Sequence, residues 1–232
     1  MAIENTIHPI QSDILVTLLL RKNARFSQLN NKKIESDLFT FHLKTLLTGG
    51  LIEKSASGYR LTTSGKEFAN RFDTEQKVIE RQAKIGVLIC AVRGEGMKRE
   101  YLLQQRLKQP YFGFWGFISG KIRWGESIYE TAEREFKEET GLKAKFNLAG
   151  VKHKTDYDLS GNLLEDKFFF VMRAENPKGK LKKIFDGGKN KWFFKKDIFK
   201  TKDLFDDVDK TLEITESGGL VFTEKKFKVK RY

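Results

Sequence analysis

The segment from Gly120 to Leu142, GKIRWGESIYETAEREFKEETGL, constrains the fold most narrowly, because its spacing marks both ends of a helix. Ser127, followed three residues later by Glu130, forms a capping box, which predicts that a helix starts just after Ser127. Gly141 supplies a left-handed stop, so the helix is predicted over residues 128–139. The side chains expected to form its buried stripe recur every four residues: Ile128, Ala132 and Phe136.

The same helix crowds acidic side chains together in a chain whose formal net charge is +13. With Glu135 as the reference, Glu138 and Glu139 lie about 60° and 40° to either side, so the three carboxylates share one face. Such like charges raise one another's pKa unless a cation lies between them, and Arg134 is expected to reach Glu130 or Glu138. Clustered carboxylates are also the ligands that Mg²⁺ or Mn²⁺ prefers. The alternative is an ordinary acidic surface helix.

Composition narrows the class of protein. The 232 residues allow one large domain or two small ones. The single cysteine, Cys90, lies in the apolar run IGVLICAV and is expected to be a small buried side chain. The longest apolar runs fall well short of the roughly 18 residues that a membrane span needs, and the sequence shows no signal peptide. These features predict a cytoplasmic protein with no membrane partner.

The positive charge is unevenly distributed. Residues 1–75 hold 10 Lys/Arg and 8 Asp/Glu, whereas residues 76–232 hold 34 and 23. The excess therefore lies in the C-terminal two thirds. It indicates either a solvated lysine-rich surface or attraction of a polyanionic ligand.

Sequence texture changes at a polar stretch, which predicts a first domain at residues 1–75, a linker at 76–82 and a second domain at 83–232. Periodicity in the first domain predicts helices over residues 10–22, 26–33 and 34–50, with Ser27 as a cap of the second. The apolar positions assigned to the third helix are Leu38, Phe41, Leu43, Leu46 and Leu47. Gly49 and Gly50 end that helix. Two short strands and a closing helix are predicted after it: Leu51–Lys54, Tyr59–Thr62 and residues 64–73.

This order resembles a winged helix-turn-helix domain, and the segments that carry the likeness are DLFTFHLKTLLTGGLIEK and GYRLTTSGKEF. In such folds the third helix enters the major groove of double-stranded DNA and the hairpin touches the backbone. The resemblance implies candidate DNA contacts on the helix and on the hairpin: Ser36, Thr40, Lys44, Lys54 and Arg60. The low net charge of residues 1–75 predicts weak or dimer-dependent binding, because phosphate neutralisation dominates affinity. The alternative is a homodimerisation or docking module.

The complete segment from Gly120 to Leu142 resembles the signature of the Nudix hydrolase superfamily. The pattern is Gly, five residues, Glu, seven residues, then Arg-Glu-apolar-any-Glu-Glu-any-Gly-apolar. The matching positions are Gly120, Glu126, Arg134, Glu135, Phe136, Glu138, Glu139, Gly141 and Leu142. The resemblance implies an α+β protein, in which the winged-helix domain is followed by a Nudix α/β/α sandwich with a mixed sheet. The chain departs from the pattern where Ile118 and Ser119 replace the usual Pro-Gly.

The resemblance also implies roles for individual residues. Glu135, Glu138 and Glu139 would be ligands of Mg²⁺ or Mn²⁺, with the Gly120 carbonyl as a further candidate. The general base would be Glu135 or a glutamate outside the signature. Arg134 would orient the carboxylates, and Glu126 would be structural.

Residues outside the signature are weaker candidates. Arg106 and Arg123 could equally hold phosphates or be surface residues, and Trp115 is a candidate to stack a base. We expect Asp158, Glu165 and Asp166 to be exposed loop acids, with an additional metal ligand or base among them as the alternative.

Relatives in this superfamily cleave a nucleoside diphosphate linked to another group by water attack on phosphorus. The favoured hypothesis is therefore a metal-dependent pyrophosphohydrolase whose first domain binds DNA or mediates dimerisation. The competing hypothesis is a transcription regulator whose Nudix domain senses a nucleotide. The intact signature and the N-terminal position of the winged helix favour the enzyme.

Overall fold

The computed structural model describes residues 7–232, which divide into two compact units that meet between Arg81 and Gln82. Each unit has its own hydrophobic core. None of the helices in this described part of the chain is both long and apolar enough to cross a membrane.

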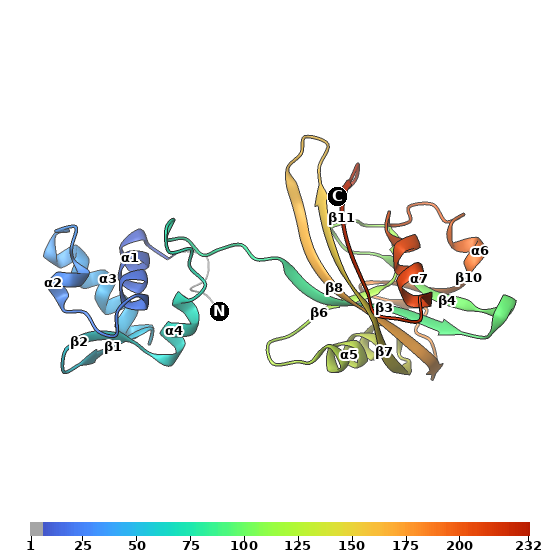
Figure 1. The fold of residues 1–232 in the computed structure, drawn as a ribbon, viewed down its shortest axis with the longest axis horizontal. Helices are drawn as coiled ribbons and strands as arrows, with labels where there is room; N and C mark the ends of the chain where they lie inside the picture. The colour runs from blue at the N-terminus through green and yellow to red at the C-terminus, as the bar shows by residue number, and fades with distance from the viewer. Residues whose placement is uncertain (1–6) are drawn as a thin grey trace. The chain divides into compact units, whose positions relative to one another are not determined.

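The first unit contains helices and a hairpin in the predicted order (Figure 1). The elements are α1 (Pro9–Leu19), α2 (Phe26–Leu29), α3 (Ser36–Thr48), β1 (Ile52–Ser55), β2 (Gly58–Leu61) and α4 (Thr63–Ala69). Ser27 was expected to cap α2, but the cap position is Arg25 and Ser27 lies inside the helix. Gly50 follows α3 with a φ of 68°, the left-handed conformation expected at a helix end.

The burial pattern of α3 corrects the predicted apolar face. Leu43 and Leu46 are buried as expected, together with Phe39. Leu38 and Phe41 were assigned to the core but are exposed, at 46% and 64%. The helix therefore presents two large apolar side chains to its surroundings.

The second unit is a mixed sheet with helices on both faces. Its elements are β3 (Lys84–Arg93), η1 (Gly96–Lys98), β4 (Glu100–Arg106), β5 (Trp115–Gly116), β6 (Ile118–Lys121), α5 (Ile128–Thr140), β7 (Lys143–Tyr157), β8 (Leu163–Lys178), β9 (Ile184–Phe185), β10 (Gly188–Phe194), α6 (Lys195–Ile198), α7 (Val208–Glu216) and β11 (Val221–Lys228). The strand order is β11-β7-β8-β3-β4-β10-β9, with β6 paired to β3 and β5 paired to β4. The β3/β8 and β11/β7 pairs are parallel, whereas the other pairs are antiparallel.

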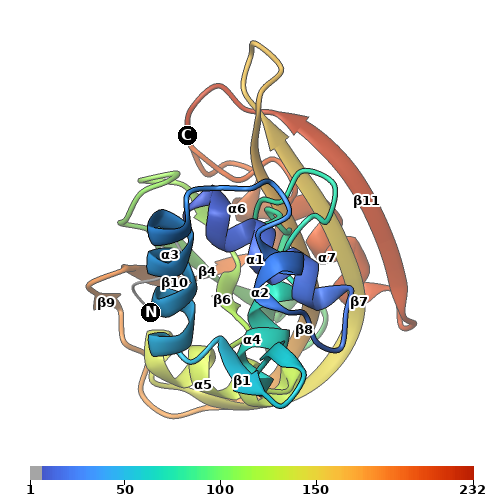
Figure 2. The ribbon, with the colours of Figure 1, turned by 90° about the vertical axis from the view of Figure 1, so that its left-hand side faces the viewer.

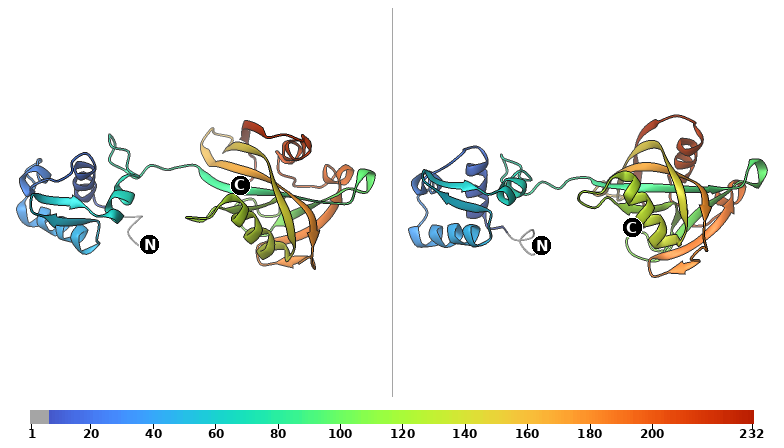
Figure 3. Two further views of the ribbon diagram at one scale, coloured as in Figure 1. Left: turned by 60° about the horizontal axis from the view of Figure 1, so that its bottom comes forward. Right: turned by 90° about the horizontal axis from the view of Figure 1, so that it is seen from below.

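Strand β3 explains why the sheet is covered on both sides. Successive side chains of a strand point to opposite faces. Val87, Ile89 and Ala91 pack in the core that contains residues of α5. Leu88 and Cys90 pack in the other core, which contains residues of α6 and α7. Helices α5 and α7 accordingly lie on opposite faces of the sheet (Figure 3), and Cys90 is fully buried as predicted.

Strand β11 lies beside β7 along the outer edge of this sheet (Figure 2). His153 of β7 connects the neighbouring strands, because its Nδ1 lies 2.6 Å from Glu224 Oε2 and its Nε2 lies 2.9 Å from Asp166 Oδ1. Its ring also stacks on Phe168 at a centroid distance of 4.0 Å. The hydrogen bond with Glu224 is the main cause that raises the pKa of His153, and Asp166 adds to it.

We expect the stabilisation from His153 to depend on pH. A raised folded-state pKa means that the stabilisation is complete below the ordinary value of about 6.5 and is lost as pH rises through the folded value. His153→Gln should therefore lower the free energy of unfolding more at pH 6 than at pH 9, by less than about 1 kcal/mol because the carboxylates are partly exposed. Urea unfolding at the two pH values measures this, and an equal loss at both would contradict it.

Candidate active site

Helix α5 forms with the termini that its sequence predicts. Ser127 Oγ accepts a hydrogen bond from the backbone N–H of Glu130, and the Glu130 carboxylate accepts from the backbone N–H of Ser127. Gly141 ends the helix with a φ of 74°. Ala132 and Phe136 are fully buried against the sheet, with Ile128 partly buried beside them. The helix is thereby fixed along the face of the sheet that carries β3 and β6.

Arg134 orients one of the glutamates, but through partners that differ from those predicted. Its Nε donates to Glu126 Oε1 at 2.5 Å and its Nη1 donates to Glu135 Oε1 at 2.7 Å. It was expected to reach Glu130 or Glu138. Glu130 instead caps the helix, and Glu138 Oε2 lies 3.7 Å from Arg134 Nη1. The hydrogen bond from Arg134 is the main cause that lowers the pKa of Glu126 to about 2.

Gly120 is required by the close approach of Glu135. A Cβ at residue 120 would lie 2.1 Å from Cγ and Cδ of Glu135, closer than packed atoms allow. The carbonyl oxygen of Gly120 in turn lies against Gly86, where a Cβ would approach it to 2.5 Å. The two glycines let α5, β6 and β3 come together, so that the Glu135 side chain rests on the strand backbone.

Glu139 is buried, which the sequence did not reveal. Its side chain is 8% exposed and accepts a hydrogen bond from Gln104 Nε2 at 2.9 Å. Burial is the main cause that raises its pKa, and the charge of Glu135 adds to this. Lys108 and Arg106 act in the opposite direction. An acidic group held in this way is stabilised by any cation that binds beside it.

Glu138 lies apart from the other two. Its side chain is 54% exposed, and its closest cations are Arg134 and Arg123, the latter at 3.9 Å. Among the described residues, no three His, Cys, Asp or Glu side chains converge to form a metal site. The donor chemistry nevertheless fits a divalent cation, because Glu135 and Glu139 line one cavity and Glu139 is buried with only partial compensation.

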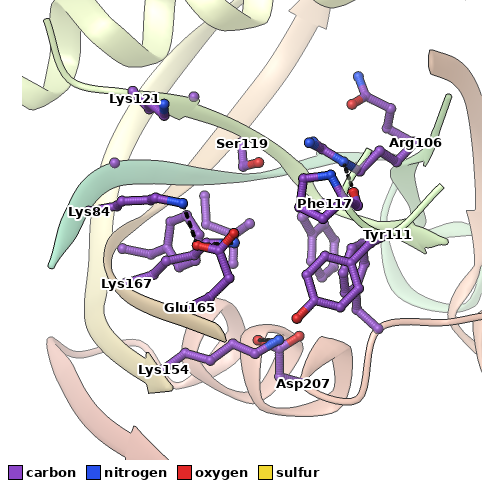
Figure 4. A pocket seen from close by; sticks show the side chains of 18 of the residues that line it. Lys84, Arg106, Tyr111, Phe117, Ser119, Lys121, Lys154, Glu165, Lys167 and Asp207 are labelled. Atoms are coloured by element: carbon purple, nitrogen blue, oxygen red, sulfur yellow. Dashed lines mark hydrogen bonds and ion pairs between the residues drawn. The ribbon is translucent and has the colours of Figure 1, made fainter. Parts of the chain in front are cut away.

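This cavity has a volume of about 540 Å³ and lies between the sheet, α5 and α7 (Figure 4). That size suits a small-molecule ligand. Glu135, Glu139 and Gly120 contribute to its lining, together with the basic side chains of Arg106 and Lys108. Aromatic side chains complete part of the wall: Tyr111, Phe117, Phe169 and Phe205.

The predicted substrate residues do not all reach the cavity. Arg106 lines it, with its guanidinium donating to the carbonyls of Pro110 at 2.5 Å and Gln109 at 3.1 Å. Arg123 has an exposed side chain and is not part of the lining. Trp115 is not part of it either, because its ring packs edge-on against Phe193 in the core below α7. A base-stacking role for Trp115 therefore has no geometric basis.

A cluster of buried charges that the sequence reading missed lies in the same cavity. Strands β7 and β8 pair Lys154 with Lys167 and Asp156 with Glu165 on one face of the sheet. Asp207, which precedes α7, lies opposite them. The signal in the sequence was the alternation of charged residues at every second position, which places them on one face of a strand.

Glu165 corrects the expectation that these acids are exposed loop residues. It lies within β8, is 3% exposed, and accepts a hydrogen bond from Lys84 Nζ at 2.6 Å. Asp158 does lie in a turn, where it is held by Asn162, and Asp166 faces His153. Glu165 is thus the only one of the three acids among the residues that line the described cavity.

The candidate DNA contacts of the first unit lie on its surface to different extents. Ser36 and Lys44 of α3 are exposed and Thr40 is half-buried. Lys54 is exposed, whereas Arg60 is bound through its Nε to Glu53 at 2.7 Å, which neutralises much of its charge. The outer face of α3 is therefore less basic, and more apolar, than the sequence reading implied.

Comparison with known proteins agrees with this architecture. The family profile of the NUDIX domain matches residues 81–212, more than half of the sequence. The chain belongs to the Nudix family, and its second unit is a Nudix hydrolase domain.

Two solved structures share the fold of the second unit. The MutT protein from Bacillus halodurans is 25% identical, with a TM-score of 0.53 over 64% of this chain and 93% of that one. The NUDIX domain of NrtR from Shewanella oneidensis, complexed with ADP ribose, is 19% identical, with a TM-score of 0.52 over 68% and 98%.

One curated relative matches a shorter region. The octanoyltransferase of Myxococcus xanthus is 37% identical over 76 residues, which is 33% of this chain. The match spans about a fifth of that protein's length, 21%.

Proposed function

We propose that this chain is a metal-dependent pyrophosphohydrolase that cleaves a nucleoside diphosphate linked to another group by water attack on phosphorus. The observation that carries the proposal is the pair Glu135 and Glu139, which line one cavity beside the basic residues Arg106 and Lys108. A buried carboxylate next to cationic side chains suits a site that gathers both a divalent cation and phosphate groups.

Glu135 and Glu139 would hold Mg²⁺ or Mn²⁺, with Glu138 and the Gly120 carbonyl as further candidate ligands. A divalent cation bound there would activate water and neutralise charge on phosphate oxygens. Gln104 holds Glu139 by its hydrogen bond, and Arg134 fixes Glu135 on the helix surface. Arg106 and Lys108 would bind phosphate by charge-assisted hydrogen bonds. The general base is Glu135 or a glutamate outside the signature.

A screen of nucleoside diphosphate derivatives tests this proposal. The purified chain would be incubated with Mg²⁺ and each compound, and release of the nucleoside monophosphate would be followed by chromatography. We expect turnover of at least one compound that stops when Mg²⁺ is chelated. Absence of turnover across nucleoside triphosphates, sugar nucleotides and dinucleoside polyphosphates would contradict the enzyme.

Binding of Mg²⁺ should stabilise the second unit. Since the carboxylate of Glu139 is buried and its neighbour Glu135 has the same charge, a bound cation removes an unfavourable interaction. We expect saturating Mg²⁺ to raise the melting temperature by roughly 5 °C at neutral pH, as a ligand specific for the folded state does. Differential scanning calorimetry checks this, with Glu139→Gln as the variant in which the shift should shrink.

A second candidate function is a nucleotide-responsive regulator that uses residues 1–75 for DNA binding. The fold similarity to the ADP-ribose-bound NrtR domain supports a nucleotide ligand for the second unit. The predicted winged-helix arrangement of residues 1–75, with a linker at 76–82, supports a DNA-binding or homodimerising module. In this hypothesis, ligand binding in the residue 83–232 domain would control the first domain.

DNA binding through α3 predicts an effect of a single charge. Lys44→Glu should weaken binding of the full chain to double-stranded DNA at low salt by roughly tenfold, because a phosphate or base contact is replaced by repulsion. Lys66→Glu on α4 is the matched control, since it makes the same charge change outside the predicted contact surface. Fluorescence anisotropy with a labelled duplex measures both, and equal losses would favour docking or dimerisation through this unit.

A further inference from the structure

The cavity has a second polar end, which the proposed hydrolysis does not use. Figure 4 shows Lys84, Lys167 and Glu165 on one side, Tyr111 and Phe117 across from them, and Lys154 with Asp207 below. Asp156 also lines this end and is 1% exposed. Buried charges cost desolvation energy and are weak stabilisers, so their concentration along a cavity wall calls for a ligand.

The charges at this end balance one another. Their cations are Lys84, Lys154 and Lys167, and their anions are Asp156, Glu165 and Asp207. Glu165 is paired with Lys84 at 2.6 Å and with Lys167 at 3.6 Å. Lys154 lies 3.2 Å from Asp156 and 3.7 Å from Asp207. A wall without net charge suits a neutral polar group better than a charged one, because a charged group would be left uncompensated.

The remaining wall favours a flat ring. Tyr111, Phe117 and Phe169 line the cavity with aromatic surface. Aromatic rings stack well against planar, polarisable groups such as nucleobases. A neutral planar head with polar edges describes a nucleobase, which fits a substrate whose phosphates lie toward Glu135 and Glu139.

The arrangement of donors and acceptors narrows the base. Asp156 Oδ2 accepts a hydrogen bond from the Tyr111 hydroxyl at 2.6 Å. Asp156 Oδ1 is buried and accepts no hydrogen bond from the described residues, although Lys154 Nζ lies near it. The ammonium of Lys154 thus lies between two carboxylates, those of Asp156 and Asp207. This end offers more acceptors than donors to a ligand.

Guanine presents the complementary edge, with two neighbouring N–H donor groups beside one carbonyl acceptor. Adenine presents one donor group beside an acceptor on the same edge, so a carboxylate would remain partly unpaired. We propose that the Lys154–Asp156–Asp207 cluster binds the guanine ring of a guanine nucleotide, with Asp156 accepting from the N–H groups and Lys154 donating to the carbonyl. This assignment rests on the proposed function for the orientation of the phosphates.

Binding of nucleoside monophosphates tests the assignment directly. Calorimetric titration of the full chain with GMP, IMP and AMP in Mg²⁺ should show GMP binding about tenfold more tightly than IMP, which lacks the 2-amino group. GMP should also exceed AMP. These comparisons need no variant. Equal binding of GMP and IMP, tighter binding of AMP, or no binding of GMP would overturn the proposal.

A variant pair locates the effect. Asp156→Asn should reduce the preference for GMP over IMP to about twofold or less, because an amide offers one acceptor and introduces donors. Asp166→Asn makes the same change one strand away on the face toward His153 and should keep the preference. An unchanged preference in folded Asp156→Asn would also overturn the assignment. A monophosphate has no phosphoanhydride, so these outcomes do not depend on whether the chain hydrolyses its substrate.

Discussion

Replacement of Glu139 by glutamine should lower the rate of phosphoanhydride hydrolysis by at least about a hundredfold, the scale of losing one key charge-stabilising group. Glu139 is the buried carboxylate of the cavity, and glutamine keeps its shape while removing the charge that would hold a divalent cation. Glu135→Gln should have an effect of similar size, because Glu135 lines the same cavity and is fixed by Arg134. Steady-state rates at saturating Mg²⁺ would be compared with the wild type.

The fold should survive both changes. Burial and the charge of Glu135 raise the pKa of Glu139, so a neutral side chain at position 139 relieves an unfavourable interaction. Glu133→Gln is the matched control, because Glu133 is exposed on the same helix and should keep the wild-type rate. Wild-type rates in Glu139→Gln would contradict the assignment of a metal ligand.

The second large effect is expected on stability, at the ion pair between β7 and α7. Lys152 Nζ lies 2.6 Å from Asp207 Oδ2 and donates to Thr211 Oγ1 at 2.9 Å. The ammonium group is buried, and burial is the main cause that lowers its pKa. Asp207→Asn should therefore lower the free energy of unfolding of the second unit by about 3 kcal/mol, because a buried charge loses its partner. Urea unfolding monitored by tryptophan fluorescence measures this loss.

A double variant separates a lost partner from lost packing. Asp207→Asn combined with Lys152→Met removes both charges, and at least about half of the lost stability should return. Asp209→Asn is the control, since Asp209 is exposed one residue into α7. A double variant less stable than the single one would show that Lys152 is not stranded by the loss of Asp207.

The sequence was most informative where local chemistry decides the structure. Both ends of α5 could be predicted because a capping box and a left-handed glycine act within a few residues. The helical spacing also placed Ala132 and Phe136 in the core. The element order of the first unit followed in the same way from periodicity and turn residues.

Contacts between distant segments could not be predicted in this way. Arg134 binds Glu126 in the preceding loop because the loop folds back over the helix, which helical spacing does not encode. Burial of Glu139 depends on Gln104 of β4. Glu165 was expected to be exposed, but the pairing of β7 with β8 turns it into the cavity.

The first unit shows the same limit. Spacing along α3 identified a helix but assigned Leu38 and Phe41 to its buried side, whereas Phe39 takes that position. Several apolar residues in a row are compatible with more than one buried face, and the packing partners α1 and β1 decide between them. The apolar outer face that results bears on whether this unit binds DNA or another protein.

The most direct test of catalysis is hydrolysis in water enriched in ¹⁸O. The wild-type chain would be incubated with Mg²⁺ and a substrate identified by the screen, and the products analysed by mass spectrometry. Water attack on phosphorus predicts a nucleoside monophosphate and a second phosphate product, with a single ¹⁸O in one of them and no turnover without a divalent cation. A chain that binds nucleotides but releases no ¹⁸O-labelled product would contradict the enzyme and identify the Nudix domain as a sensor.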